Sequence, residues 1–272
     1  MRHVVKTLVI VTFFLTFIST NAFTAELKVI KAQSVEWGYL NPLRGAKSPG
    51  AAELWGGQNK KITRQVCLFD LKKGFSSPPH IHNISYRGIV IKGLIHNADP
   101  NAEHLWMPST SYWTQPAGGN HITAANGDEN LIYLEIDSGP YLVKPSEKQF
   151  NNQEYPLNFH ADNLVWQSAD ELTALKTRQA MFLAPLWQSN DGRTKGQLLK
   201  LPADFSGNVH VMSEEFKAVI IQGAVNLASS KDNDLLEAGS YIELNGVGKF
   251  NLSSSQPAIL YIRSNGEFDV RD

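Results

Sequence analysis

The sequence is poor in cysteine and in clustered charge, and each absence excludes a class of protein. Cys67 is the only cysteine in 272 residues, which excludes an intrachain disulfide and a cysteine-based zinc or redox motif. Lysine and arginine (25) nearly balance aspartate and glutamate (26), and no basic stripe is present, so we expect no nucleic-acid partner. Hydrophobic residues at 42% and charged residues at 19% are typical of a globular protein.

Long apolar runs are also scarce, and the one that stands out lies at the N-terminus. Arg2 and Lys6 precede a mainly apolar run over residues 8–18, and mostly small or polar residues follow up to residue 25. The run is short for a bilayer span, which needs about 20 residues. Its order of charged, apolar and small residues is typical of a secretory signal peptide. We therefore expect residues 1–25 to be removed on export, giving a periplasmic or secreted protein without membrane contact; an uncleaved anchor is the alternative.

The rest of the chain contains an internal repeat. Four blocks recur in the same order, with residues 68–80 repeated at 198–210, 88–93 at 218–223, 111–112 at 240–241 and 131–133 at 259–261. Both copies consist of short β-like runs separated by clusters of Gly, Asn, Asp and Ser. Such a pattern predicts an all-β sandwich or closed barrel in each copy.

The repeat also predicts the domain boundaries. We expect an N-terminal domain at residues 26–150, a connector at 151–180 and a C-terminal domain at 181–272. The best helical candidate, residues 168–176, lies in the connector, because Ser168 can cap a helix whose third position is Glu171. Two β-domains joined by a short helical connector are therefore predicted.

Three of the eight histidines occur in two compact motifs of the N-terminal copy. His80 and His82 are two residues apart, so their side chains share one face of a strand. His121 follows a turn that contains Pro116 and Gly118. Three imidazoles that meet at one ion leave coordination positions open for water or substrate. The pattern predicts a site for one divalent ion (zinc, iron, manganese or nickel) on these three histidines.

These motifs resemble those of the cupin superfamily. The first cupin motif, G-x5-H-x-H-x3–4-E-x6-G, is matched at Gly74, His80, His82 and Gly93, and the second, G-x5-P-x-G-x2-H-x3-N, at Pro116, Gly118 and His121. More narrowly, residues 80–87 and 111–118 look like a bacterial two-cupin family of unknown function, the DUF4437 group. The resemblance extends over most of residues 36–272. It implies a bicupin, with two tandem double-stranded β-helix (jelly-roll) barrels.

Two departures from the cupin motifs bear on the site. Counting back from Gly93, the family glutamate falls on Tyr86, so the resemblance implies a three-histidine site without that carboxylate. We expect the Tyr86 ring to point into the barrel beside the ion, with an ordinary barrel position as the alternative. The first glycine of the second motif is replaced by Thr110, and its final asparagine is displaced to Asn126.

Three further residues are candidates for supporting the ligands. Gln115 and Glu135 could each supply an oxygen ligand. His96 could orient a ligand through a hydrogen bond, or could be an ordinary hydrogen-bonded barrel residue. We take Tyr86, His96 and Gln115 as the residues expected next to the ligands.

The second copy has lost the ligand set. His210 matches His80, but Met212 and Phe250 stand at the other two positions. One imidazole with a thioether and a phenyl ring is a poor site for zinc or iron. We expect no metal in the C-terminal barrel, and a structural or pocket role for His210.

The predicted site is compatible with two classes of function. As an enzyme acting on a small molecule, it could activate water in a hydrolase-like or isomerase-like reaction. With iron(II) it could instead activate dioxygen toward a diketone-like or phenolic substrate, as some three-histidine cupins do. As a non-catalytic module, it could bind a small ligand or act as a sensor with a structural metal. Fold alone cannot decide, and we favour the enzyme. The sequence is also compatible with a homo-oligomer.

Overall fold

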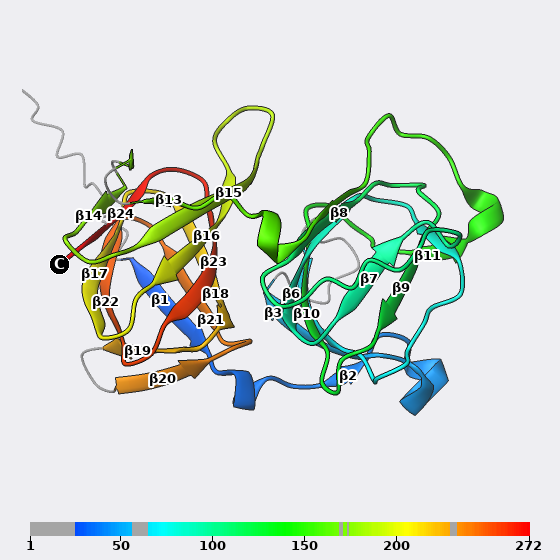
Figure 1. The fold of residues 1–272 in the computed structure, drawn as a ribbon, viewed down its shortest axis with the longest axis horizontal. Helices are drawn as coiled ribbons and strands as arrows, with labels where there is room; N and C mark the ends of the chain where they lie inside the picture. Colours follow the sequence, from blue (N-terminus) through cyan, green and yellow to red (C-terminus); the bar gives the residue numbers. More distant parts are fainter. Residues whose placement is uncertain (1–24, 56–64, 169–170, 173, 229–232) are drawn as a thin grey trace, which may run out of the picture.

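The structure, a computed structural model, describes residues 25–55, 65–168, 171–172, 174–228 and 233–272. Regular structure in these ranges is almost entirely β-strand, arranged as two barrels side by side (Figure 1). The all-β, two-barrel fold is therefore confirmed. The predicted signal peptide lies outside the described residues except for Ala25. Within the described ranges, no helix has the length and apolar character that a membrane crossing requires.

The N-terminal barrel consists of a seven-stranded sheet and two strand pairs. The sheet has the order β12-β8-β6-β10-β4-β3-β2. Its strands are β2 (Gly38–Tyr39), β3 (Gly50–Trp55), β4 (Gln65–Asp70), β6 (Tyr86–Lys92), β8 (Tyr112–Gln115), β10 (Leu131–Ile136) and β12 (Leu157–Phe159). The pairs are β5 (His80–His82) with β11 (Val143–Pro145), and β7 (Ile95–Ala98) with β9 (Ile122–Ala125). Buried side chains from the sheet and from both β7 and β9 share one apolar core.

The C-terminal barrel consists of two larger sheets. One has the order β1-β21-β18-β23-β16-β15-β13 and the other β14-β24-β17-β22-β19-β20. The first contains β1 (Glu26–Ile30), β13 (Gln167–Ser168), β15 (Phe182–Gln188), β16 (Lys195–Leu201), β18 (Glu215–Gln222), β21 (Tyr241–Asn245) and β23 (Ala258–Ser264). The second contains β14 (Leu175–Lys176), β17 (Phe205–Val211), β19 (Ala224–Ala228), β20 (Asn233–Glu237), β22 (Gly248–Ser254) and β24 (Phe268–Arg271). Apolar side chains from both sheets fill the space between them.

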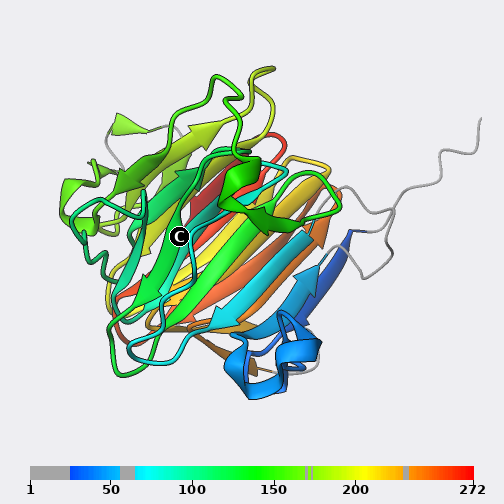
Figure 2. The ribbon, with the colours of Figure 1, turned by 90° about the vertical axis from the view of Figure 1, so that its right-hand side faces the viewer.

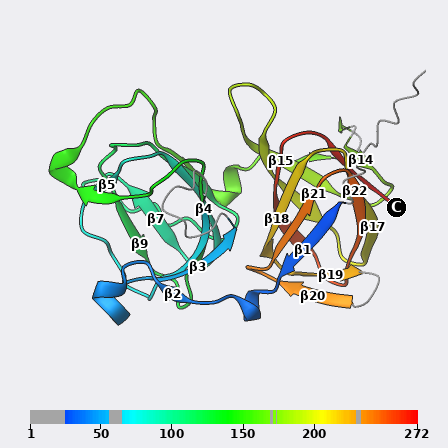
Figure 3. The ribbon, with the colours of Figure 1, turned by 180° about the vertical axis from the view of Figure 1, so that it is seen from behind.

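The first strand, β1, corrects the predicted boundary of the N-terminal domain. It pairs antiparallel with β21, from Glu26 opposite Asn245 to Ile30 opposite Tyr241, and so lies in the C-terminal barrel (Figure 3). Its alternate side chains Leu27 and Val29 pack on the core of that barrel, which explains the pairing. Residues 26–30 therefore belong to the C-terminal barrel, which is built from two separate stretches of chain.

The helix predicted at residues 168–176 does not extend over that range. Among the described residues of the connector, Ala161–Asn163 form a 3-10 turn and Glu171 is also in a 3-10 conformation. In the predicted segment, Ser168 ends β13 and Leu175 pairs with Val270 of β24. The capping contact is nevertheless present, because the Glu171 carboxylate accepts hydrogen bonds from the Ser168 N–H (2.7 Å) and hydroxyl (3.1 Å). Burial of Leu175 and strand pairing thus override the local helical signal.

The internal repeat is visible in backbone conformation. Thr110 and Gly239 occupy equivalent positions before the repeated Ser-Tyr pair, and both have left-handed φ angles, of 73° and 94°. The Thr110 N–H donates a hydrogen bond to the Val90 carbonyl, and the Gly239 N–H donates one to the Ile220 carbonyl, both at 2.8 Å. Threonine therefore keeps the backbone conformation of the glycine that it replaces, although left-handed φ is unusual for a β-branched residue.

The large sheets of the two barrels pack on each other through a shared core. Its largest members are Tyr112 and Tyr133 from one barrel and Tyr241 and Tyr261 from the other. Viewed from the side of the N-terminal barrel, the strands of both barrels run in similar directions across the picture (Figure 2). This buried aromatic layer joins the two barrels into one body.

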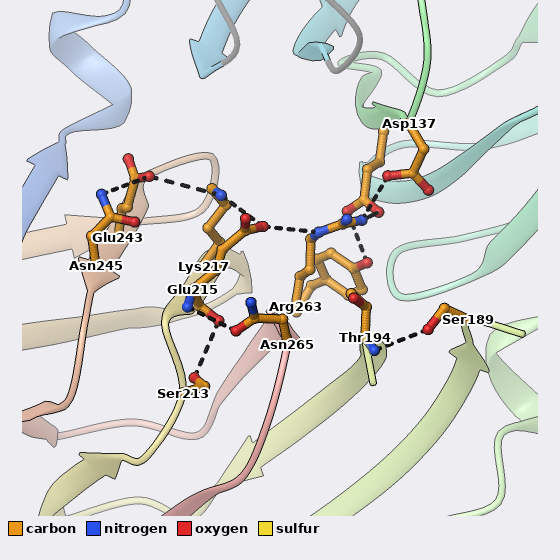
Figure 4. Close-up of polar contacts among 12 residues, drawn as sticks. Asp137, Ser189, Thr194, Ser213, Glu215, Lys217, Glu243, Asn245, Arg263 and Asn265 are labelled. Carbon is orange, nitrogen blue, oxygen red and sulfur yellow. Dashed lines mark hydrogen bonds and ion pairs between the residues drawn. The ribbon is translucent and has the colours of Figure 1, made fainter. Parts of the chain in front are cut away.

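Charged side chains cross the same interface (Figure 4). Arg263 of β23 lies 2.9 Å from Asp137 of the N-terminal barrel and 3.3 Å from Glu215. Glu215 in turn lies 2.7 Å from Lys217, which is 3.8 Å from Glu243. The network links the end of β10 to β18, β21 and β23.

Candidate metal centre

The two histidine motifs meet at a backbone bridge. His80 on β5 and His121, just before β9, each donate a 3.0 Å N–H hydrogen bond to the carbonyl of the other. The ligand atoms of His80, His82 and His121 all lie within 4.8 Å of one another, and the Nε2 atoms of His80 and His82 are 3.1 Å apart. The structure thus brings together all three histidines that the sequence predicted as ligands.

A glycine turn places His121 at this point. Gly118 has a left-handed φ of 77° and donates its N–H to the His82 carbonyl at 2.8 Å. A Cβ atom at Gly118 would lie only 2.3 Å from the Phe150 carbonyl oxygen. Only glycine fits both the backbone conformation and the space, which explains its position in the motif.

Hydrogen bonds to the backbone orient two of the imidazoles. The Nδ1 atom of His80 lies 2.8 Å from the Pro78 carbonyl oxygen, and Nδ1 of His121 lies 3.0 Å from that of Gly119. A carbonyl oxygen only accepts hydrogen bonds, so each Nδ1 carries the proton and each Nε2 keeps a free lone pair. This is the tautomer that a metal ligand bound through Nε2 requires.

Burial keeps these imidazoles neutral. Together with a smaller contribution from neighbouring imidazoles, it lowers the pKa of His82 to about 2 and that of His121 to about 3. Burial also lowers the pKa of His80. Nitrogen lone pairs that face one point without a proton repel one another, and a cation between them removes the repulsion. The set therefore fits one divalent ion.

Two tyrosines contact the histidines. The Tyr86 hydroxyl lies 3.2 Å from Nε2 of His121, so its ring points into the barrel as predicted. The Tyr141 hydroxyl lies 3.0 Å from Nε2 of His82, and the two rings are stacked with centroids 4.3 Å apart. Burial raises the pKa of both tyrosines, so the hydroxyls remain protonated donors. Tyr141 lies in the loop between β10 and β11, and no motif or spacing in the sequence identified it.

A polar network supports His121 from the other side. Gln115 donates a 3.0 Å hydrogen bond from Nε2 to the Gly119 carbonyl, which also faces Nδ1 of His121. Its Oε1 accepts a 3.0 Å hydrogen bond from Asn97, and Asn97 Oδ1 in turn accepts from Thr123 (2.8 Å). Gln115 is thus adjacent to the ligands, and it contacts the loop rather than pointing at them.

His96 and Glu135 lie elsewhere. Neighbouring residues of a strand face opposite sides, and on β7 it is Asn97 that faces the site. His96 packs against His104 and accepts a 3.2 Å hydrogen bond from the Leu105 N–H, so the interpretation of His96 as a ligand-orienting residue was wrong. Glu135 lies between the barrels, where Arg87 (2.6 Å) and Arg263 (2.5 Å) contact its carboxylate, so it cannot serve as an oxygen ligand.

The C-terminal barrel has an apolar core at the equivalent place. Val209 and Val211 of β17 point into that core, so His210 between them lies on the partly exposed face. Met212 is 47% exposed, whereas Phe250 is buried against Phe216. These positions do not converge on one point, which agrees with the loss of the ligand set.

A small apolar cavity of about 80 Å³ opens beside the histidines. Its polar lining includes His80, His82, Tyr86 and Tyr141. Its apolar walls include Phe69, Leu71, Phe75, Trp113 and Leu134. Among the described residues that line it, none is a carboxylate. A molecule in this cavity would meet the histidines and tyrosines at one end and hydrocarbon elsewhere.

Comparison with protein families identifies the chain. A model of the domain of unknown function DUF4437 matches residues 28–271. The protein belongs to the DUF4437 family. No curated protein matches the chain. The match covers both barrels, so the DUF4437 domain is the whole two-barrel unit.

Solved structures show the same fold at low sequence identity. A Nostoc punctiforme protein provisionally described as a dioxygenase is 15% identical, with a TM-score of 0.69 over 89% of this chain and 83% of that one. Salicylate 1,2-dioxygenase from Pseudaminobacter salicylatoxidans is 14% identical, with a TM-score of 0.57 over 89% and 84%. A Geobacillus kaustophilus protein is 12% identical, with a TM-score of 0.54 over 89% and 96%. The DUF4437 chain therefore shares its fold with these proteins.

Proposed function

We propose that this DUF4437 protein is a metal-dependent oxidoreductase that catalyses a dioxygenase-like reaction on a small molecule in its N-terminal barrel. The observation that carries the proposal is the convergence of three imidazoles on one point, two of which, His80 and His82, line an apolar cavity. A divalent ion on three protein ligands keeps positions open for substrate. Iron(II) would supply dioxygen activation there. Structural similarity to salicylate 1,2-dioxygenase supports this class of reaction.

The spacing of two imidazoles supports a shared ion. Two ligand atoms each about 2.1 Å from an ion are about 3.0 Å apart at a right angle and about 3.4 Å apart at a tetrahedral angle. The Nε2 atoms of His80 and His82 are 3.1 Å apart. This distance lies between the two values, so the pair can hold an ion in either coordination geometry.

The chain's own residues have separable tasks in this proposal. His80, His82 and His121 hold the ion. Gln115 fixes the loop carbonyl that orients His121, and the apolar walls exclude water from the substrate. Tyr86 takes the place of the family carboxylate with a neutral hydroxyl, so the protein ligands leave the charge of the ion uncompensated.

Cavity size limits the substrate. An apolar cavity of about 150 Å³ can hold benzene. The cavity beside the histidines, at about 80 Å³, is roughly half that size. It favours a compact aliphatic substrate, such as a diketone-like molecule, over a phenolic ring.

Oxygen consumption by metal-loaded protein tests the proposal. Protein reconstituted anaerobically with iron(II), manganese(II), nickel(II) or zinc(II) is screened against short diketones, hydroxy acids and phenols with an oxygen electrode. We expect uptake with a redox-active ion and a compact substrate, and none with zinc or with His121→Ala. Ligand binding without turnover under every metal would favour the non-catalytic alternative.

We also propose that the protein acts outside the cytoplasm. The composition of residues 1–25 supports export. Mass spectrometry of the protein from fractionated cells tests this. We expect the exported fraction to contain mature protein that begins between residues 22 and 26. Full-length protein in the cytoplasm would contradict export.

A further inference from the structure

The Tyr141 hydroxyl faces the histidine site. It lies 3.0 Å from Nε2 of His82, and the stacked rings, 14° from parallel, hold it there. Tyr86 differs, because its hydroxyl lies 3.2 Å both from Nε2 of His121 and from Oδ1 of Asn97. Both tyrosines line the cavity. Tyr86 therefore keeps an acceptor for its proton, the Asn97 amide oxygen, when an ion occupies the histidines.

An ion on His82 changes the position of Tyr141. When an ion binds Nε2 of His82, that nitrogen has no lone pair left for the Tyr141 hydroxyl 3.0 Å away, and the hydroxyl proton needs another acceptor. A buried donor without a partner is unfavourable. The loaded site therefore favours a ligand that offers an acceptor oxygen beside His82.

Charge points to the same kind of ligand. An imidazole that binds an ion through its nitrogen lone pair is neutral, and none of the described residues lining the cavity is a carboxylate. The double positive charge of the ion is then not balanced by any described side chain of the cavity. In a cavity with mainly apolar walls, a small anion bound at the open position gains more than it would in water.

We propose that Tyr141 binds an anionic oxygen of the substrate beside the ion, and that the site selects small carboxylate or enolate anions. The inference rests on the metal site of the proposed function, but it does not depend on turnover. Tyr141 acts by donating its hydroxyl proton in a hydrogen bond to that oxygen. Tyr86 contributes less to binding this oxygen, because its hydroxyl can still donate a hydrogen bond to Oδ1 of Asn97.

Binding of a probe anion to cobalt(II)-loaded, full-length protein tests this. Cobalt content is measured first, and acetate is then titrated while the visible absorption of the ion is followed. We expect Tyr141→Phe to retain cobalt and to weaken acetate binding about tenfold or more, the scale of one hydrogen bond to a charged group. Tyr86→Phe should have a smaller effect. Tyr133→Phe, which removes a buried hydroxyl at the barrel interface, should have none.

A second comparison needs no variant. In the wild-type protein, acetate should bind at least tenfold more tightly than acetamide, which has the same shape and no charge. Equal affinities for acetate and acetamide, or unchanged acetate binding in Tyr141→Phe, would overturn the inference. Loss of cobalt from Tyr141→Phe would also overturn it, by making Tyr141 a ligand. Wild-type protein that holds no cobalt would refute the metal site itself, and the inference with it.

Discussion

Leu134 and Glu135 are neighbours on β10, yet one lines the cavity beside the histidines and the other lies between the two barrels. The alternation of side chains along a strand accounts for this. Glu135 is completely buried there and accepts hydrogen bonds from Arg87, Arg263, Tyr133 and Tyr261. One strand thus forms a wall of the site and carries the central charge of the interface.

Replacement of Glu135 should destabilise the protein strongly. Glu135→Gln keeps the shape but removes the charge that faces two arginines, and an unpaired buried charge is costly. We expect the free energy of unfolding to fall by about 3 kcal/mol, measured by urea denaturation. The metal content of the folded variant should be unchanged, since Glu135 faces away from the histidines.

Asp128→Asn serves as the matched control. Asp128 forms an ion pair with Lys73 at 2.7 Å, but its side chain is 90% exposed. Exposed pairs contribute little to stability, so no measurable change is expected. If Glu135→Gln were as stable as this control, the buried charge would not hold the barrels together.

The turn before His121 should tolerate no side chain. Gly118 and Gly74 have almost the same φ, 77° and 76°, but a Cβ atom at Gly118 meets the Phe150 carbonyl whereas one at Gly74 meets nothing within 4 Å. Gly74→Ala should cost about 1–2 kcal/mol for the backbone conformation alone. Gly118→Ala should cost a further 1–3 kcal/mol or so from overpacking.

Metal affinity separates the two glycine variants further. Gly118 donates to the His82 carbonyl and precedes His121, so Gly118→Ala should also weaken metal binding in a competition titration. Gly74→Ala should bind metal as the wild type does. Equal stabilities and affinities of the two variants would show that the turn does not position the ligand.

Acid stability should depend on Asp269. Its side chain is 1% exposed and lies 2.8 Å from Lys176 and 2.7 Å from Arg271. The hydrogen bond from Arg271 lowers its pKa to about 2, below the value near 3.9 of an unfolded chain. A lowered pKa in the folded state stabilises the protein above pH 4, and this stabilisation disappears as the pH falls from 4 to 2.

Asp269→Asn removes this contribution. At pH 7 we expect the variant to be less stable than the wild type by about 2–3 kcal/mol. Most of this difference should be lost by pH 2, when about half of the wild-type carboxyl is protonated. A difference that does not vary with pH would show that the contacts of Asp269 are not charge-dependent.

The ligands were predictable because their signal is local. His80 and His82 share a strand face by spacing alone, and the Pro-Gly turn marks the start of the strand that follows His121. Counting from Gly93 also placed Tyr86 at the site correctly. His96 was misassigned because it is its neighbour Asn97 that faces the site. The sequence did not determine which side chains of residues 95–98 point into the barrel.

The remaining differences depend on contacts between distant parts of the chain. Tyr141 reaches His82 from a loop 59 residues away in sequence, which no motif marks. Strand β1 joins a partner more than two hundred residues away, at β21. Residues 175–176, at the end of the predicted helix, pair with β24 instead. Tertiary packing decided each of these cases.

The central claim is that the three histidines bind one divalent ion, and elemental analysis of the full-length protein tests it most directly. The intact chain is required because β1 belongs to the C-terminal sheet, so a C-terminal half expressed alone would lack one of its strands. We expect one ion per wild-type chain and none in His80→Ala or His121→Ala, with His210→Ala retaining the metal. All variants should still unfold cooperatively, because the ion occupies a preformed barrel. Stoichiometric metal in His121→Ala, or a metal-free wild type after reconstitution, would contradict the account.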